Sequence, residues 1–205
     1  MLIITIVRLL IAEFRVLIDS LKTLDQQIHA QQHAKSGAGS NGARTALKEL
    51  LREHIERHQE LIRTMHRLRS LLRFPSLLHI GFYLIAEAAF LVRLLIIKGE
   101  FALGLMIPLT ATSLFIFEIF VFCMHIETLL DLNEQVGFVL YSFRWYDHMQ
   151  LGKSYRQNIS IVLFQAHNTI PFTAGGTFII NAELFANLVR ITYSVVMGLG
   201  YMLSK

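Results

Sequence analysis

Two pairs of histidines are the first candidates for chemistry in this sequence. His29 and His33 lie in a polar tract, and His54 and His58 lie in a segment with helical periodicity. Histidines one helical turn apart can hold two corners of a zinc site, but such a site needs at least three protein ligands. No third ligand stands at a useful spacing. We therefore expect His54 and His58 to be hydrogen-bonded helix residues, and the first pair to belong to a solvated linker.

Three carboxylates in apolar segments, Glu87, Glu118 and Glu183, are the second candidates. An ionised residue at the centre of a membrane-spanning helix costs about 2.5–3.5 kcal/mol on insertion scales, so such residues usually face protein or water. The three stand in separate segments without a paired acid–base motif, and no nucleotide loop, nucleophile elbow or haem motif accompanies them. The sequence argues against an enzyme, and we expect no catalytic residue, no bound metal and no cofactor.

The composition indicates a membrane protein. Hydrophobic residues make up 54% of the chain and charged residues 17%, with a mean hydropathy of +0.49. Soluble domains carry about 25% charged residues, so this chain lacks the charge to cover a soluble surface. The net charge of +4 comes without basic–aromatic interleaving, so we expect no nucleic-acid partner. The single cysteine, Cys123, excludes an intrachain disulfide.

Three stretches are long and apolar enough to cross a bilayer, which takes about 20 residues at 1.5 Å each. They are residues 77–97, 101–126 and 177–203, and the first two are joined by a minimal turn that makes them antiparallel. Residues 1–28 pass from apolar to charged, as expected for the end of an earlier span and its extension. The apolar start has no basic region or cleavage site, so we predict no signal peptide.

The segments between these spans are polar. Residues 29–43 combine a Gln/His tract with Gly and Ser and predict a linker. Residues 44–76 predict an amphipathic helix, whose seam repeats at alternating spacings of four and three residues. Such a seam packs against other helices rather than lipid, and it comprises Leu47, Leu51, His54, His58, Leu61, Met65, Leu68 and Leu72.

Residues 127–176 predict an anchor region outside the membrane. It continues the second span as a helix, reaches the aromatic cluster of residues 141–147, and proceeds through a half-helix to a hinge at Pro171–Gly176. The cytoplasmic side of a membrane carries the excess of Lys and Arg. Ten basic residues lie between Leu21 and Pro75, whereas Lys98 stands alone in the opposite turn. This asymmetry places residues 21–75 and 127–160 inside the cell and the C-terminus outside.

The last third of the chain resembles a known family. Four features follow one another in this part of the chain: Tyr141 and Trp145, a basic-polar segment, Gln165 followed by Pro171-Phe-Thr-Ala-Gly, and Thr192-Tyr193-Ser194 within an apolar helix. Their order resembles the C-terminal signature of insect odorant receptors. The related gustatory receptors usually carry Gln-Phe where Leu199-Gly200 stand here. The odorant branch is therefore favoured, with a gustatory-type chemoreceptor and a truncated non-functional fragment as alternatives.

The resemblance implies an all-α, polytopic fold, running from the end of the fourth helix to the seventh helix of a seven-helix receptor. It implies a subunit of an odorant-gated, non-selective cation channel in the plasma membrane of olfactory sensory neurons. The implied partners are a volatile odorant, the lipid bilayer and the odorant receptor co-receptor, with which the subunit forms a hetero-oligomer, a tetramer.

Three groups of site residues follow from this reading. The odorant site is expected on one helical face of the sixth helix, formed by Met106, Thr110, Ser113 and Phe117. Packing between helices explains that face equally well. The pore is expected at the outer end of the last helix, lined by Ser194, Val195, Gly198, Tyr201 and Met202. The alternative is that Gly198 and Gly200 only allow this helix to pack closely against a neighbour. The assembly surface takes the amphipathic seam and the aromatic cluster: Leu51, Leu61, Met65, Tyr141 and Trp145.

Overall fold

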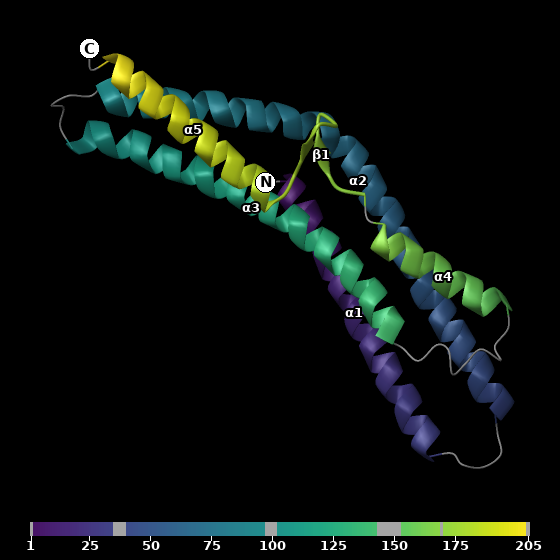
Figure 1. Ribbon diagram of the computed structural model, residues 1–205. Helices are drawn as coiled ribbons and strands as arrows, with labels where there is room; N and C mark the ends of the chain where they lie inside the picture. Colours follow the sequence, from purple (N-terminus) through teal and green to yellow (C-terminus); the bar gives the residue numbers. More distant parts are fainter. Residues whose placement is uncertain (1, 35–39, 97–101, 143–152, 169, 204–205) are drawn as a thin grey trace. The chain divides into compact units, whose positions relative to one another are not determined.

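The chain is a set of long helices interrupted by one short hairpin (Figure 1). The computed structural model describes residues 2–34, 40–96, 102–142, 153–168 and 170–203. The elements in these ranges are α1 (Leu2–Ala34), α2 (Ser40–Ile96), α3 (Ala102–Ser142), α4 (Lys153–His167), β1 (Thr173–Ala174), β2 (Phe178–Ile179) and α5 (Ala182–Leu203). The all-α fold class is confirmed. The turn at Lys98–Glu100, and Trp145 with most of its cluster, lie outside the described residues.

Two helices run further than the sequence suggested. α1 continues through the Gln/His tract to Ala34, because Gln and Ala are good helix formers. α2 continues through Pro75. A proline inside a helix costs about 3 kcal/mol, but Leu72 before it and Ile80 after it are both buried, so the packing of both sides holds the helix together.

The chain divides into two compact units. Unit 1 comprises Met1–Leu68 and Thr128–Ile170, and unit 2 comprises Arg69–Glu127 and Pro171–Lys205. Helices α2 and α3 each contribute one part to either unit. Unit 2 contains the most apolar segments, whereas unit 1 contains the amphipathic ones.

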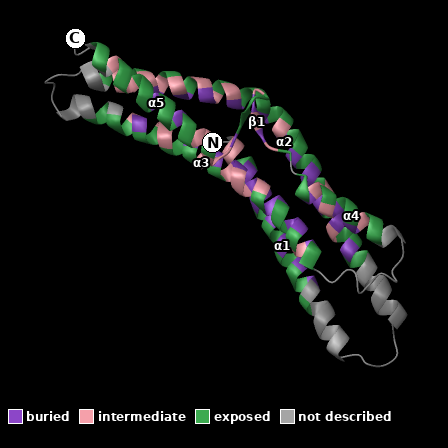
Figure 2. Cartoon of the chain, in the orientation of Figure 1, coloured by how far each residue is buried: buried purple, intermediate pink, exposed green. Residues whose placement is uncertain are grey.

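Unit 1 is built from helices that all present seams with heptad spacing. Figure 2 shows buried residues recurring as stripes along α1, α2 and α3. Spacings of three and four residues bring side chains to one helix face and produce knobs-into-holes packing. On α1 the buried stripe is Val7, Leu10, Phe14, Leu17, Leu21 and Leu24, and on α3 it is Leu129, Asn133, Val136 and Leu140. The heptad seam predicted for residues 44–76 is confirmed on α2 between Leu51 and Leu72. There Leu51, His58, Leu61, Met65, Leu68 and Leu72 are buried and His54 is half-buried.

A polar pair lies inside this apolar core. His58 is 1% exposed and Asn133 is 0% exposed, and His58 Nε2 lies 3.1 Å from Asn133 Oδ1. Asn133 also donates from Nδ2 to the Ala166 carbonyl at 3.4 Å, so one amide connects α2, α3 and α4. Phe14 of α1 meets the His58 ring edge-on, with ring centroids 6.3 Å apart. All four helices of unit 1 therefore converge on this pair.

The pair also determines the protonation state of His58. An amide oxygen only accepts, so His58 Nε2 carries the proton, and Nδ1 is buried without a hydrogen-bond partner. Burial lowers the pKa of His58, and the hydrogen bond with Asn133 offsets part of that shift. A second proton would have to be placed on the unpartnered Nδ1, which makes the charged form unfavourable.

His54 is satisfied differently. Its Nε2 lies 2.7 Å from the Ser20 hydroxyl of α1, and its Nδ1 lies 2.7 Å from the Leu50 carbonyl. Both histidines of this pair are thus hydrogen-bonded helix residues, as the sequence predicted. An ion pair from Arg57 to Glu13, at 2.7 Å, adds a second connection between α2 and α1.

The stability of the protein is expected to fall as the pH drops below about 6.5, the ordinary pKa of histidine. His58 has a lowered pKa in the folded protein, so the unfolded chain binds the proton more tightly, and acid favours unfolding until the folded pKa is reached. The measurement is the melting temperature of the detergent-solubilised protein between pH 8 and pH 5. In a chain of this size, about 1 kcal/mol moves Tm by about 2–4 °C.

Matched glutamine variants assign this effect to one residue. His58→Gln keeps an amide beside Asn133 but removes the titrating group, so it should flatten the pH profile. His54→Gln, one turn away and less buried, should keep the wild-type profile. An unchanged pH dependence in His58→Gln would contradict the assignment.

Candidate functional site

Unit 2 contains the apolar parts of α2, α3 and α5. Within the described part of the chain, these three helices are long and apolar enough to cross a membrane. The first half of α2 carries many charges, so the crossing part of that helix is the stretch after Pro75. Only 17–28% of the most apolar window of each helix is buried. The remaining apolar surface therefore meets lipid or another protein chain.

A tight hairpin precedes the last helix. Strands β1 and β2 are antiparallel, and the Thr177 amide donates to the Ala174 carbonyl at 3.2 Å. Gly175 and Gly176 between them have φ of 63° and 89°, a conformation that glycine adopts without strain. The sequence predicted a hinge at Pro171–Gly176, and the structure shows an ordered turn there.

This hairpin is docked on α2. The Gly175 amide donates to the Arg73 carbonyl at 2.7 Å. A Cβ added at Gly175 would come within 2.9 Å of the Leu77 side chain, and one at Gly176 would overlap the Arg73 guanidinium. Both glycines are therefore required for close approach as well as for their positive φ.

The N-terminus of α5 is held by two side-chain caps. Asn181 Oδ1 accepts from the Leu184 amide at 2.8 Å, and Glu127 Oε2, from α3, accepts from the Ala182 amide at 3.0 Å. A carboxylate here is also favoured by the positive end of the helix dipole. Phe185 then meets Phe120 of α3, with ring centroids 5.3 Å apart. The expected helix 177–203 therefore begins only at Ala182, because Thr177–Asn181 complete the hairpin and the cap.

The four residues expected to bind odorant lie together on one exposed face of α3. Met106 and Phe117 are 59% and 63% exposed, and Thr110 and Ser113 are exposed between them. Thr110 and Ser113 help to line a shallow depression of about 340 Å³. Their hydroxyls donate to carbonyls of their own helix at 2.9 Å. These hydroxyls therefore offer a ligand acceptor oxygens rather than donors.

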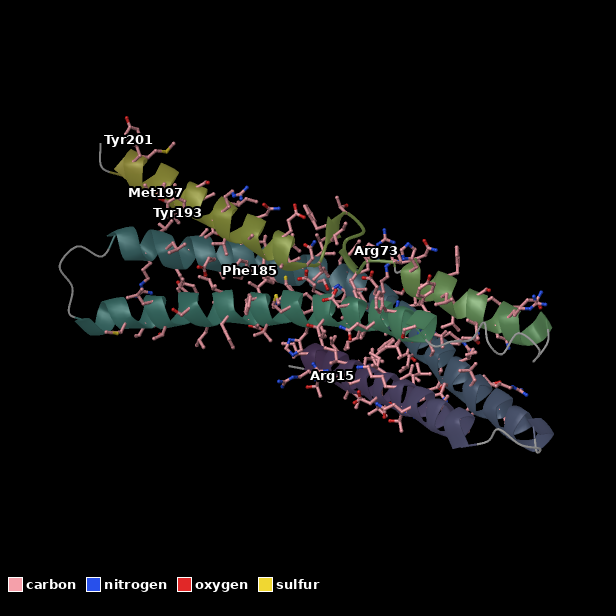
Figure 3. The ribbon with its side chains drawn as sticks, turned by 60° about the horizontal axis from the view of Figure 1, so that its bottom comes forward. Arg15, Arg73, Phe185, Tyr193, Met197 and Tyr201 are labelled. Atoms are coloured by element: carbon pink, nitrogen blue, oxygen red, sulfur yellow. The ribbon has the colours of Figure 1, made fainter. Side chains whose placement is uncertain are left out.

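The five residues expected to line a pore also lie on exposed parts of α5: Ser194, Val195, Gly198, Tyr201 and Met202. Nothing lies within 4 Å of a Cβ placed at Gly198. Figure 3 shows Tyr193, Met197 and Tyr201 following one another along α5. Leu188 and Thr192, by contrast, are buried within the chain. One face of α5 packs internally and the other remains open.

The residues expected at the assembly surface fall into two groups. Leu51, Leu61 and Met65 are buried by unit 1 itself. The seam of α2 is therefore buried by helices of its own chain and not by a helix from a partner. This is possible because α1 and α3 present seams of the same periodicity. Tyr141, on α3, is 68% exposed, and Phe138 beside it is 75% exposed. Trp145 lies outside the described residues.

Buried polar groups occur in unit 2 as well. Glu87 is buried, as its position within a span suggested, and its Oε2 has no hydrogen-bond partner. The Tyr83 hydroxyl, one turn earlier, is likewise buried and unpartnered. Glu118 and Glu183, the other two carboxylates, are exposed. In the described part of the chain, no three His, Cys, Asp or Glu residues are grouped so as to hold a metal ion.

Sequence reasoning missed two residues of structural consequence, Asn133 and Glu127. Asn133 was detectable as the polar member of a heptad stripe on α3. Glu127 has no local signal, because its partner amide is 55 residues away.

Comparison with known proteins shows the family of this chain. The family described as 7tm odorant receptor matches residues 1–193, almost the entire chain. No curated protein matches the chain. That family consists of membrane receptors rather than enzymes, which agrees with the three apolar helices. This multi-pass membrane protein belongs to the odorant receptor family.

Proposed function

We propose that the chain is a subunit of an odorant-gated, non-selective cation channel that acts with the odorant receptor co-receptor. The family match over residues 1–193 carries this proposal. The complex is a tetramer in the plasma membrane of olfactory sensory neurons. Residues 21–75 and 127–160, with most of the basic residues, lie in the cytoplasm, and the C-terminus is extracellular, following the positive-inside rule.

The open face of α5 supports a pore-lining role. A conduction path needs a water-tolerant helix face and an apolar constriction that can close. Ser194, Gly198 and Tyr201 supply the water-tolerant face, while Val195 and Met202 supply the apolar constriction. The internal face of α5 and its double cap at Asn181 and Glu127 hold the other end of this helix in unit 2.

The exposed face of α3 supports an odorant-binding role. Met106 and Phe117 offer adaptable apolar surface, and Thr110 and Ser113 offer acceptor oxygens above a shallow depression. A depression this open needs a further wall, which another helix of the receptor would supply.

Assembly with the co-receptor is proposed to use the exposed aromatic surface of unit 1. Phe138 and Tyr141 are large apolar side chains exposed side by side near the end of α3. Leu51, Leu61 and Met65 contribute indirectly, because their burial holds the helices that present this surface.

Single cysteines at Gly198, Tyr201 and Met202, in the receptor expressed with its co-receptor, test the pore. A water-soluble methanethiosulfonate should react at these positions in the open channel and reduce odorant-evoked current by roughly half or more, because the added group occupies the pore. Thr192→Cys, buried on the same helix, is the matched control, and native Cys123 is fully buried. If none of the three cysteines changes permeation or reacts, α5 does not line the pore.

Met106→Ala should shift the half-maximal concentration of the preferred odorant by about tenfold and change the ranking of odorants, since it removes apolar contact. Thr110→Val should weaken only odorants that donate a hydrogen bond, because the hydroxyl proton is already used within the helix. The assay is a dose–response series with alcohols and their methyl ethers. Ile107→Ala, exposed but off the stripe, is the control. Unchanged ranking in Met106→Ala would leave helix packing as the role of this face.

Tyr141→Glu should abolish co-purification with the co-receptor while leaving membrane insertion and melting temperature intact. The new carboxylate is exposed to solvent in the free subunit, and it becomes buried without a partner only in the complex. Leu61→Glu should lose both co-purification and thermal stability, since Leu61 is buried within unit 1. Normal co-purification of Tyr141→Glu would refute the proposed surface.

A further inference from the structure

A cleft of about 380 Å³ lies between α1 and α3 within unit 1. Each helix contributes four residues at positions i, i+3, i+4 and i+7, so each presents one continuous stripe. The stripe of α1 is Arg15, Ile18, Asp19 and Lys22, and the stripe of α3 is Thr128, Asp131, Leu132 and Gln135. Ile18 and Leu132 are buried and form an apolar floor, whereas the charged residues around them are exposed. Arg15 is labelled on α1 in Figure 3.

The position of the cleft along α3 gives its depth in the membrane. The apolar run of α3 ends at Ile126, and Thr128 is the first cleft residue after it. The apolar start of α1, which contains Arg8, likewise ends at Ala12, and Glu13 and then Arg15 follow it. Between Thr128 and Gln135 the helix rises about 10 Å. The polar layer on each side of a bilayer is about 5–8 Å thick. The end of the cleft at Thr128 and Arg15 therefore lies at the depth of the lipid headgroups.

The charges of the cleft select the chemistry of its ligand. Two cations, Arg15 and Lys22, stand with two carboxylates, Asp19 and Asp131, so the lining has no net charge. A lone anion would meet the carboxylates as well as the cations. A zwitterion with a phosphate and an ammonium group instead satisfies both. A primary ammonium donates hydrogen bonds to carboxylates, and a quaternary choline does not.

We propose that this cleft binds the headgroup of a phosphatidylethanolamine-type phospholipid. The phosphate lies against Arg15 and Lys22, the primary ammonium lies against the carboxylates, and the first part of the acyl chains follows the apolar surface of α3 toward the bilayer. This inference rests on the membrane topology of the chain and not on its channel activity.

The test measures which lipids stay bound to the purified receptor. The receptor is reconstituted in nanodiscs of equal phosphatidylethanolamine and phosphatidylcholine and transferred to mild detergent, and the retained lipids are quantified by mass spectrometry. We expect a preference of roughly threefold to tenfold for phosphatidylethanolamine, the size of effect that a partly exposed charge-assisted hydrogen bond produces. Excess inorganic phosphate should not displace the lipid, whereas glycerophosphoethanolamine should.

Variants divide the effect between the two charges of the headgroup. Asp19→Asn should abolish the preference between the two lipids while phospholipid is still retained. The double variant Arg15→Gln/Lys22→Gln should reduce retention of both. Glu134→Gln and Arg67→Gln, exposed residues outside the cleft, are the matched controls and should behave as wild type. Equal retention of both lipids by the wild type, or a full preference in Asp19→Asn, would overturn the proposal and leave the four charges to pair with one another.

Discussion

The hydrogen bond between His58 and Asn133 is the interaction on which the packing of unit 1 depends. Heptad seams of Leu, Ile and Val can slide by one heptad with little change in buried area, because every layer resembles the next. A buried polar pair removes that freedom, since any other register leaves an imidazole and an amide without partners in an apolar core. The Asn133 amide extends the same constraint to α4 through the Ala166 carbonyl. Gly137, one turn further along α3, permits this approach, because a Cβ there would lie 2.6 Å from Ala166 Cβ.

A second constraint acts at the base of α5. The hairpin is fixed to α2 through Gly175 and Arg73, and the first amide of α5 is fixed to α3 through Glu127. Helix α5 thus starts from a point defined by both of the other apolar helices of unit 2. Its later turns bury little surface apart from Thr192, and they leave Ser194 and Gly198 on the open side. A helix held firmly at one end and loosely packed along its length is suited to move at its far end, which is where the proposed pore residues lie.

The candidate sites share one property, which is that each is a helix face left open by the chain's own packing. The stripe of Met106, Thr110, Ser113 and Phe117 was predictable because helical spacing alone brings these residues to one side. Its exposure was not predictable, because exposure depends on which face of α3 the other helices cover. The seam of α2 illustrates the converse. Its periodicity identified a buried stripe correctly, but could not say whether the burying helices came from the same chain or from a partner.

The amino-acid sequence by itself determined the helical class, the apolar spans and the membrane setting, because these follow from hydrophobicity and periodicity read along the chain. It also determined that the chain must turn at Gly175 and Gly176, since two adjacent glycines carry their own conformational signal. Only the tertiary structure decided that α2 runs unbroken through Pro75, that His58 meets Asn133 across 75 residues, and that Glu127 caps a helix 55 residues later. Such contacts carry no local pattern, because a side chain's partner is selected by the packing of whole helices and not by the residues beside it in the chain.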